Sequence, residues 1–332
     1  MRAVVVEQFG EPADVVKVAE VPTPSRAEGM ARVRMLLSPI NPSDLMTIRG
    51  IYGRRPSLPF TPGYEGVGVV EEASGVIAWM RGLKGKRVAV LNGTGGNWAE
   101  QVVIPARQCI PLPDDLPDEQ GASYFVNPAT VLVMIRYVLK VPRGAWLLQT
   151  AAGSALGRMI IRLGKRDGFK TINLVRRREQ LTELKALGAD EVLVSGEDDI
   201  LARVRSLTPQ TAGVGYALDC VGGSMGSQAV ACLGSGGRLL LYGTLSNDPI
   251  RLESRSLMVG RKTIEGFWLA DWVKLQSPWV MLSLFRQITA LIREGILTTD
   301  VGACFPLDQI SQAVQEAERV GRGGKVMLRL GQ

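Results

Sequence analysis

The sequence predicts an α/β protein of two domains, one rich in short strands and one built on a doubly wound parallel sheet. Residues 1–120 hold short apolar runs separated by glycine- and proline-rich turns, which is typical of a distorted barrel or sandwich. From residue 121 strands and helices alternate, which indicates a parallel sheet covered by helices. The sequence of residues 296–332 has the same strand-and-turn pattern as residues 1–120. We therefore expect a β-rich domain over residues 1–120 and 296–332 and a nucleotide-binding domain over residues 121–295, with ligands in the cleft between them.

The β-rich domain should consist of strands joined by irregular loops. Apolar runs bounded by turn residues predict strands at residues 2–7, 30–37, 63–70, 86–90 and 98–104, and in the tail at residues 325–330. Asn41 opens the turn Asn41-Pro42-Ser43-Asp44 and is a candidate N-cap for a short helix over residues 45–49. A tail helix should run to residue 320.

The second domain should alternate buried strands with amphipathic helices. The expected strands lie at residues 146–149, 171–175, 191–194, 214–220 and 237–242, and the expected helices at residues 127–139, 155–167, 179–187 and 278–294. The last helix has clear signals at both ends. Ser277 suits the N-cap, Pro278 the first helical position and Gly295 the stop.

The segment from residue 146 to residue 178 carries the main functional signal. It is a strand–turn–helix–strand unit whose turn is made of small residues, so free backbone N–H groups and a helix N-terminus face a potential pyrophosphate. The glycine pattern is degenerate, because the G-x-G-x-x-G positions hold Ala152, Ser154 and Gly157. A turn whose small residues merely allow close packing is the alternative.

Three consecutive arginines follow the second strand of this unit. An enzyme that uses NAD places an acidic residue there, about 20 residues after the turn, to bind the ribose hydroxyls. Arg176, Arg177 and Arg178 stand there instead, and guanidinium groups suit a 2′-phosphate. The arginines therefore favour NADPH over NADH. The alternative is a solvated start to the next helix.

The composition excludes several kinds of catalytic site. The chain has no histidine, so it has no histidine base and no Ser-His-Asp triad. It has no C-x-x-C spacing either, and we expect no metal site. The cysteines are Cys109, Cys220, Cys232 and Cys304, and their apolar settings predict reduced core residues. Any proton transfer must use tyrosine, lysine, a carboxyl, a thiol or water.

Hydropathy and charge also limit where the protein could act and what it could bind. No apolar run reaches the roughly 18 residues of a membrane span, and the start does not have the pattern of a signal peptide, so we expect a cytoplasmic protein without a membrane partner. The net charge of +7 is dispersed apart from the arginines. It suits small anionic ligands and does not predict nucleic-acid binding.

Several motifs resemble one known family. They are Asn41-Pro42-Ser43-Asp44, Gly50-Ile51-Tyr52-Gly53, Gly96-Asn97-Trp98, Val126-Asn127-Pro128-Ala129-Thr130, Thr171-Ile172-Asn173-Leu174-Val175-Arg176, Asp219-Cys220-Val221-Gly222-Gly223 and Gly266-Phe267-Trp268-Leu269. The whole chain resembles the zinc-free branch of the medium-chain dehydrogenase/reductase superfamily, and within it the mitochondrial-type trans-2-enoyl thioester reductases. Zinc members carry a cysteine and a histidine near Asn41 and Tyr64, and both are replaced here. The resemblance implies a GroES-like first domain and a Rossmann second domain.

The resemblance implies a reaction and a proton donor. The reaction is NADPH-dependent reduction of the C2–C3 double bond of an enoyl thioester carried on coenzyme A or an acyl carrier protein. Hydride goes to the β carbon and a proton to the α carbon. The family assigns that proton to the tyrosine at the position of Tyr52, and a phenol of high pKa is a sensible donor. A loop tyrosine that only stacks or hydrogen-bonds is the alternative.

Further site residues follow from the same resemblance. Asn41, Tyr52 and Trp268 would border the substrate. The residues expected to contact NADPH are Asn127, Thr130, Gly153, Ser154, Ala155, Leu156, Gly157, Arg176, Arg177, Arg178, Tyr242, Gly243, Thr244, Leu245, Phe267, Trp268, Leu269 and Lys325. Arg177 departs from the family, which has an acidic residue there. Phe267 and Trp268 have an alternative role as core aromatics.

Two other functions remain open. A zinc-free NADPH quinone oxidoreductase or activated-alkene reductase would use the same scaffold and the same tyrosine. A non-catalytic RNA-binding or structural relative is the third hypothesis, and the lack of a basic stripe interleaved with aromatics is evidence against it. A homodimer is a family-level expectation.

Overall fold

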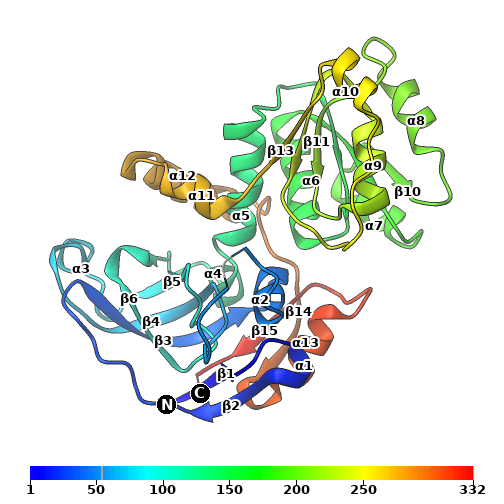
Figure 1. Cartoon of the computed structure of the whole chain (residues 1–332). Coiled ribbons are helices and arrows are strands. Elements are labelled where there is room, and N and C mark those ends of the chain that lie inside the picture. The colour runs from blue at the N-terminus through cyan, green and yellow to red at the C-terminus, as the bar shows by residue number, and fades with distance from the viewer. Residues whose placement is uncertain (54, 332) are drawn as a thin grey trace. The chain divides into compact units, whose positions relative to one another are not determined.

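The computed structural model describes residues 1–53 and 55–331 and divides into two compact units (Figure 1). Unit 1 comprises Met1–Val126 with Thr298–Gln332, and unit 2 is Asn127–Leu297. The sequence places the boundaries at residues 120 and 296 instead. Residues 121–126 join unit 1 because the N–H groups of Phe125 and Val126 donate to the carboxylate of Glu65, a residue of that unit.

The strands of unit 1 pair antiparallel, except that β14 and β15 run parallel. One sheet pairs β1 (Arg2–Val6) with β2 (Val16–Glu20). The larger sheet has the order β14-β15-β3-β4-β5-β7, with β6 also paired to β3. Its strands are β3 (Met30–Pro39), β4 (Glu65–Ala73), β5 (Arg87–Leu91), β6 (Gln101–Pro105), β7 (Cys109–Pro111), β14 (Val301–Pro306) and β15 (Lys325–Arg329).

Short helices close the ends of unit 1 around one core. They are α1 (Pro12–Val15), α2 (Pro42–Ile48), α3 (Val76–Arg81), α4 (Asp118–Ala122), α13 (Ile310–Glu318) and the 3₁₀ turns η1 (Ala106–Gln108) and η3 (Leu307–Gln309). The core contains Met35, Ile48, Leu83 and Trp98, all fully buried. Strand β4 pairs with β3 so closely that a Cβ at Gly68 would lie 2.5 Å from the carbonyl oxygen of Arg34. The sheet therefore requires glycine at position 68.

Unit 2 is a parallel sheet with helices packed on it. The order is β10-β9-β8-β11-β12-β13, and every pairing is parallel. Numbered along the chain this is 3-2-1-4-5-6, the doubly wound arrangement of dinucleotide-binding domains. The strands are β8 (Trp146–Gln149), β9 (Lys170–Val175), β10 (Glu191–Val194), β11 (Val214–Asp219), β12 (Leu233–Leu241) and β13 (Thr263–Gly266). The predicted α/β fold is confirmed.

The helices of unit 2 include the predicted long ones. They are α5 (Val126–Leu132), η2 (Val133–Val138), α6 (Ala155–Asp167), α7 (Gln180–Leu187), α8 (Ile200–Leu207), α9 (Gly223–Ala231), α10 (Ser254–Gly260), α11 (Leu269–Lys274) and α12 (Pro278–Arg293). Ser277 caps α12 as expected, because its hydroxyl accepts from the N–H of Val280.

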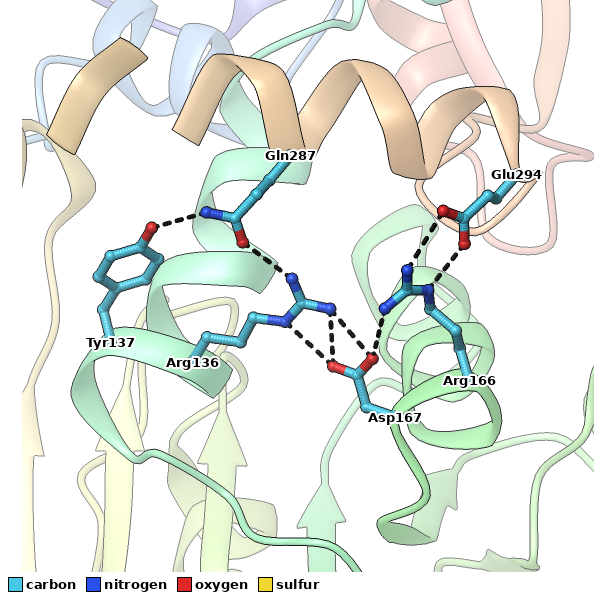
Figure 2. A network of polar contacts seen from close by, with 6 residues as sticks. All are labelled: Arg136, Tyr137, Arg166, Asp167, Gln287 and Glu294. Carbon is cyan, nitrogen blue, oxygen red and sulfur yellow. Dashed lines mark hydrogen bonds and ion pairs between the residues drawn. The ribbon is translucent and has the colours of Figure 1, made fainter. Parts of the chain in front are cut away.

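A polar network ties three helical segments of unit 2 together (Figure 2). The guanidinium of Arg136, on η2, makes two-pronged hydrogen bonds of 2.9–3.0 Å to the carboxylate of Asp167 at the end of α6. It also donates to Gln287 of α12 at 2.8 Å. Arg166 binds both Asp167 and Glu294, which follows α12. The network therefore fixes α12 against η2 and α6.

The structure departs from the sequence-based elements in a few places. The helix predicted over residues 127–139 becomes π-helical after Leu132. Strand β2 and helix α3 were not expected. Cys304 was expected in the core but is exposed, because it lies on the edge strand β14, whose residues are mostly exposed. The other three cysteines are buried as expected.

Candidate functional site

The carboxyl ends of three neighbouring strands of unit 2 converge on Asp219. Its Oδ1 accepts from the hydroxyl of Thr150, the residue after β8, at 2.6 Å, and from the N–H of Val221 at 3.0 Å. The N–H of Tyr242, after β12, donates to the carbonyl of Asp219 at 2.9 Å. β8 and β11 are neighbours where the strand order reverses, and open α/β sheets bind ligands there.

The turn after β8 has the form expected for a phosphate-binding loop. Ala151 has a left-handed φ of 48°, a conformation that glycine adopts with least strain. Ser154 caps α6, because its hydroxyl accepts from the N–H of Gly157 at 3.1 Å. A Cβ at Gly157 would lie 2.5 Å from the carbonyl oxygen of Ala152, so only glycine lets α6 start this close to the strand.

Two glutamines support this turn. The side chain of Gln149 donates to the carbonyl of Gly157 at 3.0 Å and to Oδ1 of Asn173 on β9 at 2.7 Å. The side chain of Gln180, from the first residue of α7, fills the space beside Gly153 that a Cβ would need. The turn is therefore held between β9 and α7. The first two residues of α6 are Ala155 and Leu156. Both are among the residues that the sequence analysis expects to contact the cofactor.

The three arginines lie at the end of β9, next to this turn. The N–H of Ala152 donates to the carbonyl of Leu174, so the turn and the end of β9 are adjacent. Arg176, Arg177 and Arg178 are exposed. Arg178 binds Glu197 at 2.9 Å. Within residues 1–53 and 55–331, Arg176 and Arg177 form no ion pair, so both guanidiniums are available to an anion.

The other residues expected to contact the cofactor in unit 2 lie on or after its strands and on α5. Gly243 and Leu245 follow β12 and pack against Cys220, whose carbonyl accepts from the N–H of Leu245 at 3.1 Å. Burial raises the pKa of the Tyr242 phenol well above its ordinary value. Thr244 is exposed, Phe267, Trp268 and Leu269 follow β13, and Asn127 and Thr130 lie on α5.

A buried polar cluster in unit 1 surrounds Asn41. Its side-chain oxygen accepts from the ammonium of Lys325 at 2.6 Å, and its nitrogen donates to Oε1 of Glu65 at 3.0 Å. Oε2 of Glu65 accepts from the N–H groups of Phe125 and Val126. The N–H of Asn41 donates to Asp44 at 2.8 Å, which confirms the helix start at Asn41.

Burial dominates the electrostatics of this cluster. It raises the pKa of Asp44 to about 7 and lowers the pKa of Lys325 to about 8. It also raises the pKa of Glu65, although the hydrogen bonds from Val126 and Asn41 oppose the shift. Asn41, Asp44, Glu65 and Lys325 are at most 4% exposed. The amide of Asn41 thus stands near the position to which the resemblance assigns a ligand in the zinc members, and it binds an ammonium instead. Among the described residues, no group of three or more cysteines or carboxylates could hold a metal ion.

Tyr52 follows α2 and is half-buried beside a second tyrosine. Its ring centroid lies 5.9 Å from that of Tyr64, and its N–H donates to the carbonyl of Met46 at 3.2 Å. The hydroxyl of Thr47 donates its one proton to the carbonyl of Ser43. The same hydroxyl lies 2.7 Å from the phenol oxygen of Tyr64, so in that hydrogen bond Tyr64 is the donor and Thr47 the acceptor. Tyr64 also lines a small surface depression with Phe60 and Thr94.

The structure thus brings together two sets of the predicted residues, one in each unit. Asn41 and Lys325 touch in unit 1, and the turn lies beside the arginines in unit 2. Sequence reasoning missed Thr150, Asp219, Gln180, Glu65 and Asp44 as supporting residues. The only signal for Asp219 is its position after a buried strand, and Glu65 stands out only as a carboxylate within a glycine-rich apolar strand.

Comparisons with known proteins support these assignments of fold. Residues 27–114 match the family model of the alcohol dehydrogenase GroES-like domain, and residues 155–285 match that of the zinc-binding dehydrogenases. The mitochondrial enoyl-[acyl-carrier-protein] reductase of Xenopus tropicalis is 31% identical over 96% of this chain and 92% of its own length. That of Rattus norvegicus is 32% identical over 95% of this chain and 85% of its own.

Solved structures resemble the chain over nearly its whole length. A structure described as an NADPH:quinone reductase of Bacillus thuringiensis has a TM-score of 0.92 and 32% identity, covering 99% of this chain and 98% of its own. A mycobacterial protein in complex with NADPH has a TM-score of 0.88 and 26% identity, covering 99% of both chains. The chain belongs to the mitochondrial-type enoyl thioester reductases of the medium-chain dehydrogenase/reductase superfamily.

Proposed function

We propose that this protein catalyses the NADPH-dependent reduction of the C2–C3 double bond of trans-2-enoyl thioesters. The observation that carries the proposal is the identity of 31–32% to mitochondrial enoyl-[acyl-carrier-protein] reductases over most of both chains. The phenol of Tyr52, half-buried beside Tyr64, supports it because this protonation requires a weak acid and the chain has no imidazole. The substrate carrier is coenzyme A or an acyl carrier protein.

The residues of unit 2 fit NADPH. The turn at Gly153 and Ser154 presents the N-terminus of α6, where N–H groups and the helix dipole stabilise a pyrophosphate. Arg176 and Arg177, without an ion pair among the described residues, are suited to bind the 2′-phosphate, and Arg178 is shared with Glu197. When bound, NADPH supplies the hydride for the β carbon.

The protein's own groups complete the reduction. As the β carbon is reduced, negative charge develops on the thioester oxygen and the α carbon becomes basic. The hydroxyl of Tyr52 gives its proton to the α carbon and is reprotonated from water, so the substrate gains one hydride and one proton. Tyr64 packs against the Tyr52 ring and holds it in position. Trp268 is proposed to border the acyl group. Asn41 is buried with both amide atoms bound, so its contact with the substrate stays a prediction of the resemblance.

A substrate comparison tests the proposal. NADPH consumption is followed at equal protein concentration with crotonyl-CoA and with phenanthrenequinone. We expect faster turnover with crotonyl-CoA, and butyryl-CoA as the product. Turnover of the quinone alone would contradict the proposal and establish the second candidate, an NADPH quinone oxidoreductase. That candidate is favoured by the 31–32% identity to structures described as NADPH:quinone reductases.

The state and location of the protein are further proposals. We propose a homodimer acting in the cytoplasm, on a small thioester substrate, with no nucleic-acid partner. Among the described residues, no helix combines the length and the hydropathy that a bilayer span needs. An RNA-binding role would be revived by tight, salt-sensitive RNA binding without turnover.

A further inference from the structure

Helix α3 of unit 1 turns an apolar face outward. The exposed fractions of Val76, Ile77, Trp79 and Met80 are 72%, 42%, 81% and 72%. Ala78 is the only buried residue of the helix, and it anchors the helix to the core. A surface helix normally buries its apolar stripe and exposes polar residues, so α3 is the reverse of that arrangement. Four neighbouring exposed apolar side chains indicate an interaction surface, whereas single ones do not.

The backbone holds this apolar face in a fixed shape. The N–H of Trp79 donates to the carbonyl of Gly75 at 3.1 Å, and that of Leu83 to Ala78 at 3.1 Å. Gly82 ends the helix in the left-handed conformation, and Leu83 is fully buried just beyond it. The four apolar side chains are therefore displayed on a formed helical turn that is anchored at Ala78 and Leu83.

Basic residues surround the C-terminal end of this helix. Residues 75–87 contain Arg81, Lys84, Lys86 and Arg87 and no acidic residue. The ammonium of Lys86 lies 4.0 Å from the Cβ position of Gly82. Arg81 donates to the carbonyl of Arg107 at 3.5 Å, which places a further basic residue beside it. We call Arg81, Lys84, Lys86 and Arg107 the basic rim.

The charges of the basic rim are not neutralised within unit 1. All four residues are exposed, and in the part of the chain that the structure describes none of them forms an ion pair. Arg87 differs because it binds Asp118 at 2.8 Å. Glu28 is an acidic neighbour, but it lies beside Gly75 at the N-terminal end of α3, away from the basic rim. The surface thus combines apolar side chains with uncompensated positive charge.

We propose that α3 and its basic rim dock on an anionic lipid bilayer. Tryptophan favours the boundary between headgroups and acyl chains, and valine, isoleucine and methionine lose water by entering it. Lysine and arginine beside them are attracted to anionic headgroups. An acidic protein would complement the positive charges of the basic rim, but it would also have to bury four bulky apolar side chains. A second copy docked isologously would bring like charges together. A bilayer satisfies both features at once. Such peripheral docking departs from the sequence-based expectation of no membrane partner, which rested on the lack of an apolar run long enough to span a bilayer.

This inference is independent of the proposed reaction, because none of these residues is part of the proposed site. The test is cosedimentation of the full chain with vesicles of phosphatidylcholine alone and of phosphatidylcholine with phosphatidylglycerol, at low and high salt. We expect binding to the phosphatidylglycerol vesicles at low salt, with a blue shift of the tryptophan emission that Trp79→Ala removes. High salt should weaken the binding, since the attraction is screened.

Matched variants assign the binding to this surface. Trp79→Ala should weaken it roughly tenfold, whereas Trp279→Ala removes an equally exposed tryptophan of α12 in unit 2 and should change nothing. Each of Lys84→Ala and Lys86→Ala should weaken it about fivefold. Melting temperatures verify that each variant is folded, and turnover of crotonyl-CoA should equal that of the wild type.

Several outcomes would overturn the proposal. They are wild-type protein left in the supernatant with phosphatidylglycerol vesicles, equal binding to both vesicle types regardless of salt, and Trp79→Ala binding like Trp279→Ala. A change of sedimentation coefficient caused by Trp79→Ala without lipid would assign α3 to contact with a second copy instead. Loss of binding to an acidic carrier protein in Trp79→Ala, with no lipid binding in the wild type, would assign it to that partner.

Discussion

Lys325 and Asn41, 284 positions apart in the sequence, meet in a buried hydrogen bond of 2.6 Å from the ammonium to the amide oxygen. The amide nitrogen of Asn41 donates in turn to Glu65, so one side chain bridges a cation and an anion. The resemblance assigns Lys325 to the cofactor, and that role stays a prediction. The bond to Asn41 gives Lys325 a structural role that can be measured separately.

Lys325→Met should lower the free energy of unfolding by about 3–5 kcal/mol. The substitution leaves Glu65 and Asp44 buried without their cation. Urea unfolding at pH 7, followed by circular dichroism, measures the loss. The double variant Lys325→Met, Glu65→Gln should recover part of it, because one of the two carboxyls left without a cation is also removed. If the single variant is as stable as the wild type, the cluster is not stabilised by charge pairing.

Asp44 should make stability depend on pH. Burial raises its pKa from 3.8 to about 7, so between these values the folded chain keeps a proton that the unfolded chain has lost. The contribution is present in full below pH 4 and is lost as pH rises through 7, by on the order of 2–4 kcal/mol. Urea unfolding across this range should show a steeper fall for the wild type than for Asp44→Asn. Parallel curves would show that Asp44 is ionised throughout.

Tyr52→Phe should slow enoyl reduction by about 10²–10⁴-fold, because the α carbon loses its proton donor. NADPH binding, measured by fluorescence titration, should not change. Tyr64→Phe is the matched control, since it removes the neighbouring hydroxyl but keeps the ring beside Tyr52. A large loss in Tyr64→Phe together with normal turnover in Tyr52→Phe would transfer the donor role to Tyr64.

Arg176→Ala with Arg177→Ala should reduce the preference for NADPH over NADH roughly 10–100-fold, the effect of losing charge-assisted hydrogen bonds to a phosphate. The ratio of kcat/KM for the two cofactors measures it. Arg178→Ala should have a smaller effect because Arg178 already binds Glu197. Arg205→Ala on α8 removes one positive charge elsewhere in unit 2 and is the control for Arg176→Ala or Arg177→Ala alone. An equal loss of preference in that control would indicate general electrostatics.

Asp167→Ala should destabilise unit 2 by about 1–3 kcal/mol, because two arginines lose their shared carboxylate (Figure 2). Asp271→Ala, which breaks an exposed pair with Lys274, should cost less than about 1 kcal/mol. Differential scanning calorimetry of both variants gives the comparison. Equal shifts of melting temperature would show that the network adds nothing beyond ordinary surface pairs.

Much of the sheet in unit 2 could be predicted from the sequence because its strands are buried on both faces. Such strands are short continuous apolar runs, and β8 and β10 have the predicted bounds. Strand β2 was missed because its residues include Lys17 and Glu20 and its one partner is β1. Helix α3 was missed because it is only six residues long and lacks a polar face.

The parts of the candidate site that lie close together in the sequence were predictable. The parts that bring distant segments together were not. The turn and the arginines follow one another within a single strand–helix–strand unit, so spacing alone relates them. The bond between Lys325 and Asn41 depends on β15 pairing with β3, which no local pattern indicates. The role of Asp219 likewise depends on β11 lying next to β8. The hydrogen-bond partners of Lys325 and Asp219 are therefore known only from the assembled sheets.

The ammonium of Lys325 also limits how this scaffold could be re-engineered. Introducing cysteine and histidine at Asn41 and Tyr64 would recreate the ligand types of the zinc relatives, but it would leave a buried positive charge within reach of the incoming dication. Coulomb repulsion in such a dry environment would oppose metal uptake. A designer who wants a metalloenzyme from this chain would therefore have to neutralise Lys325 before adding any ligand.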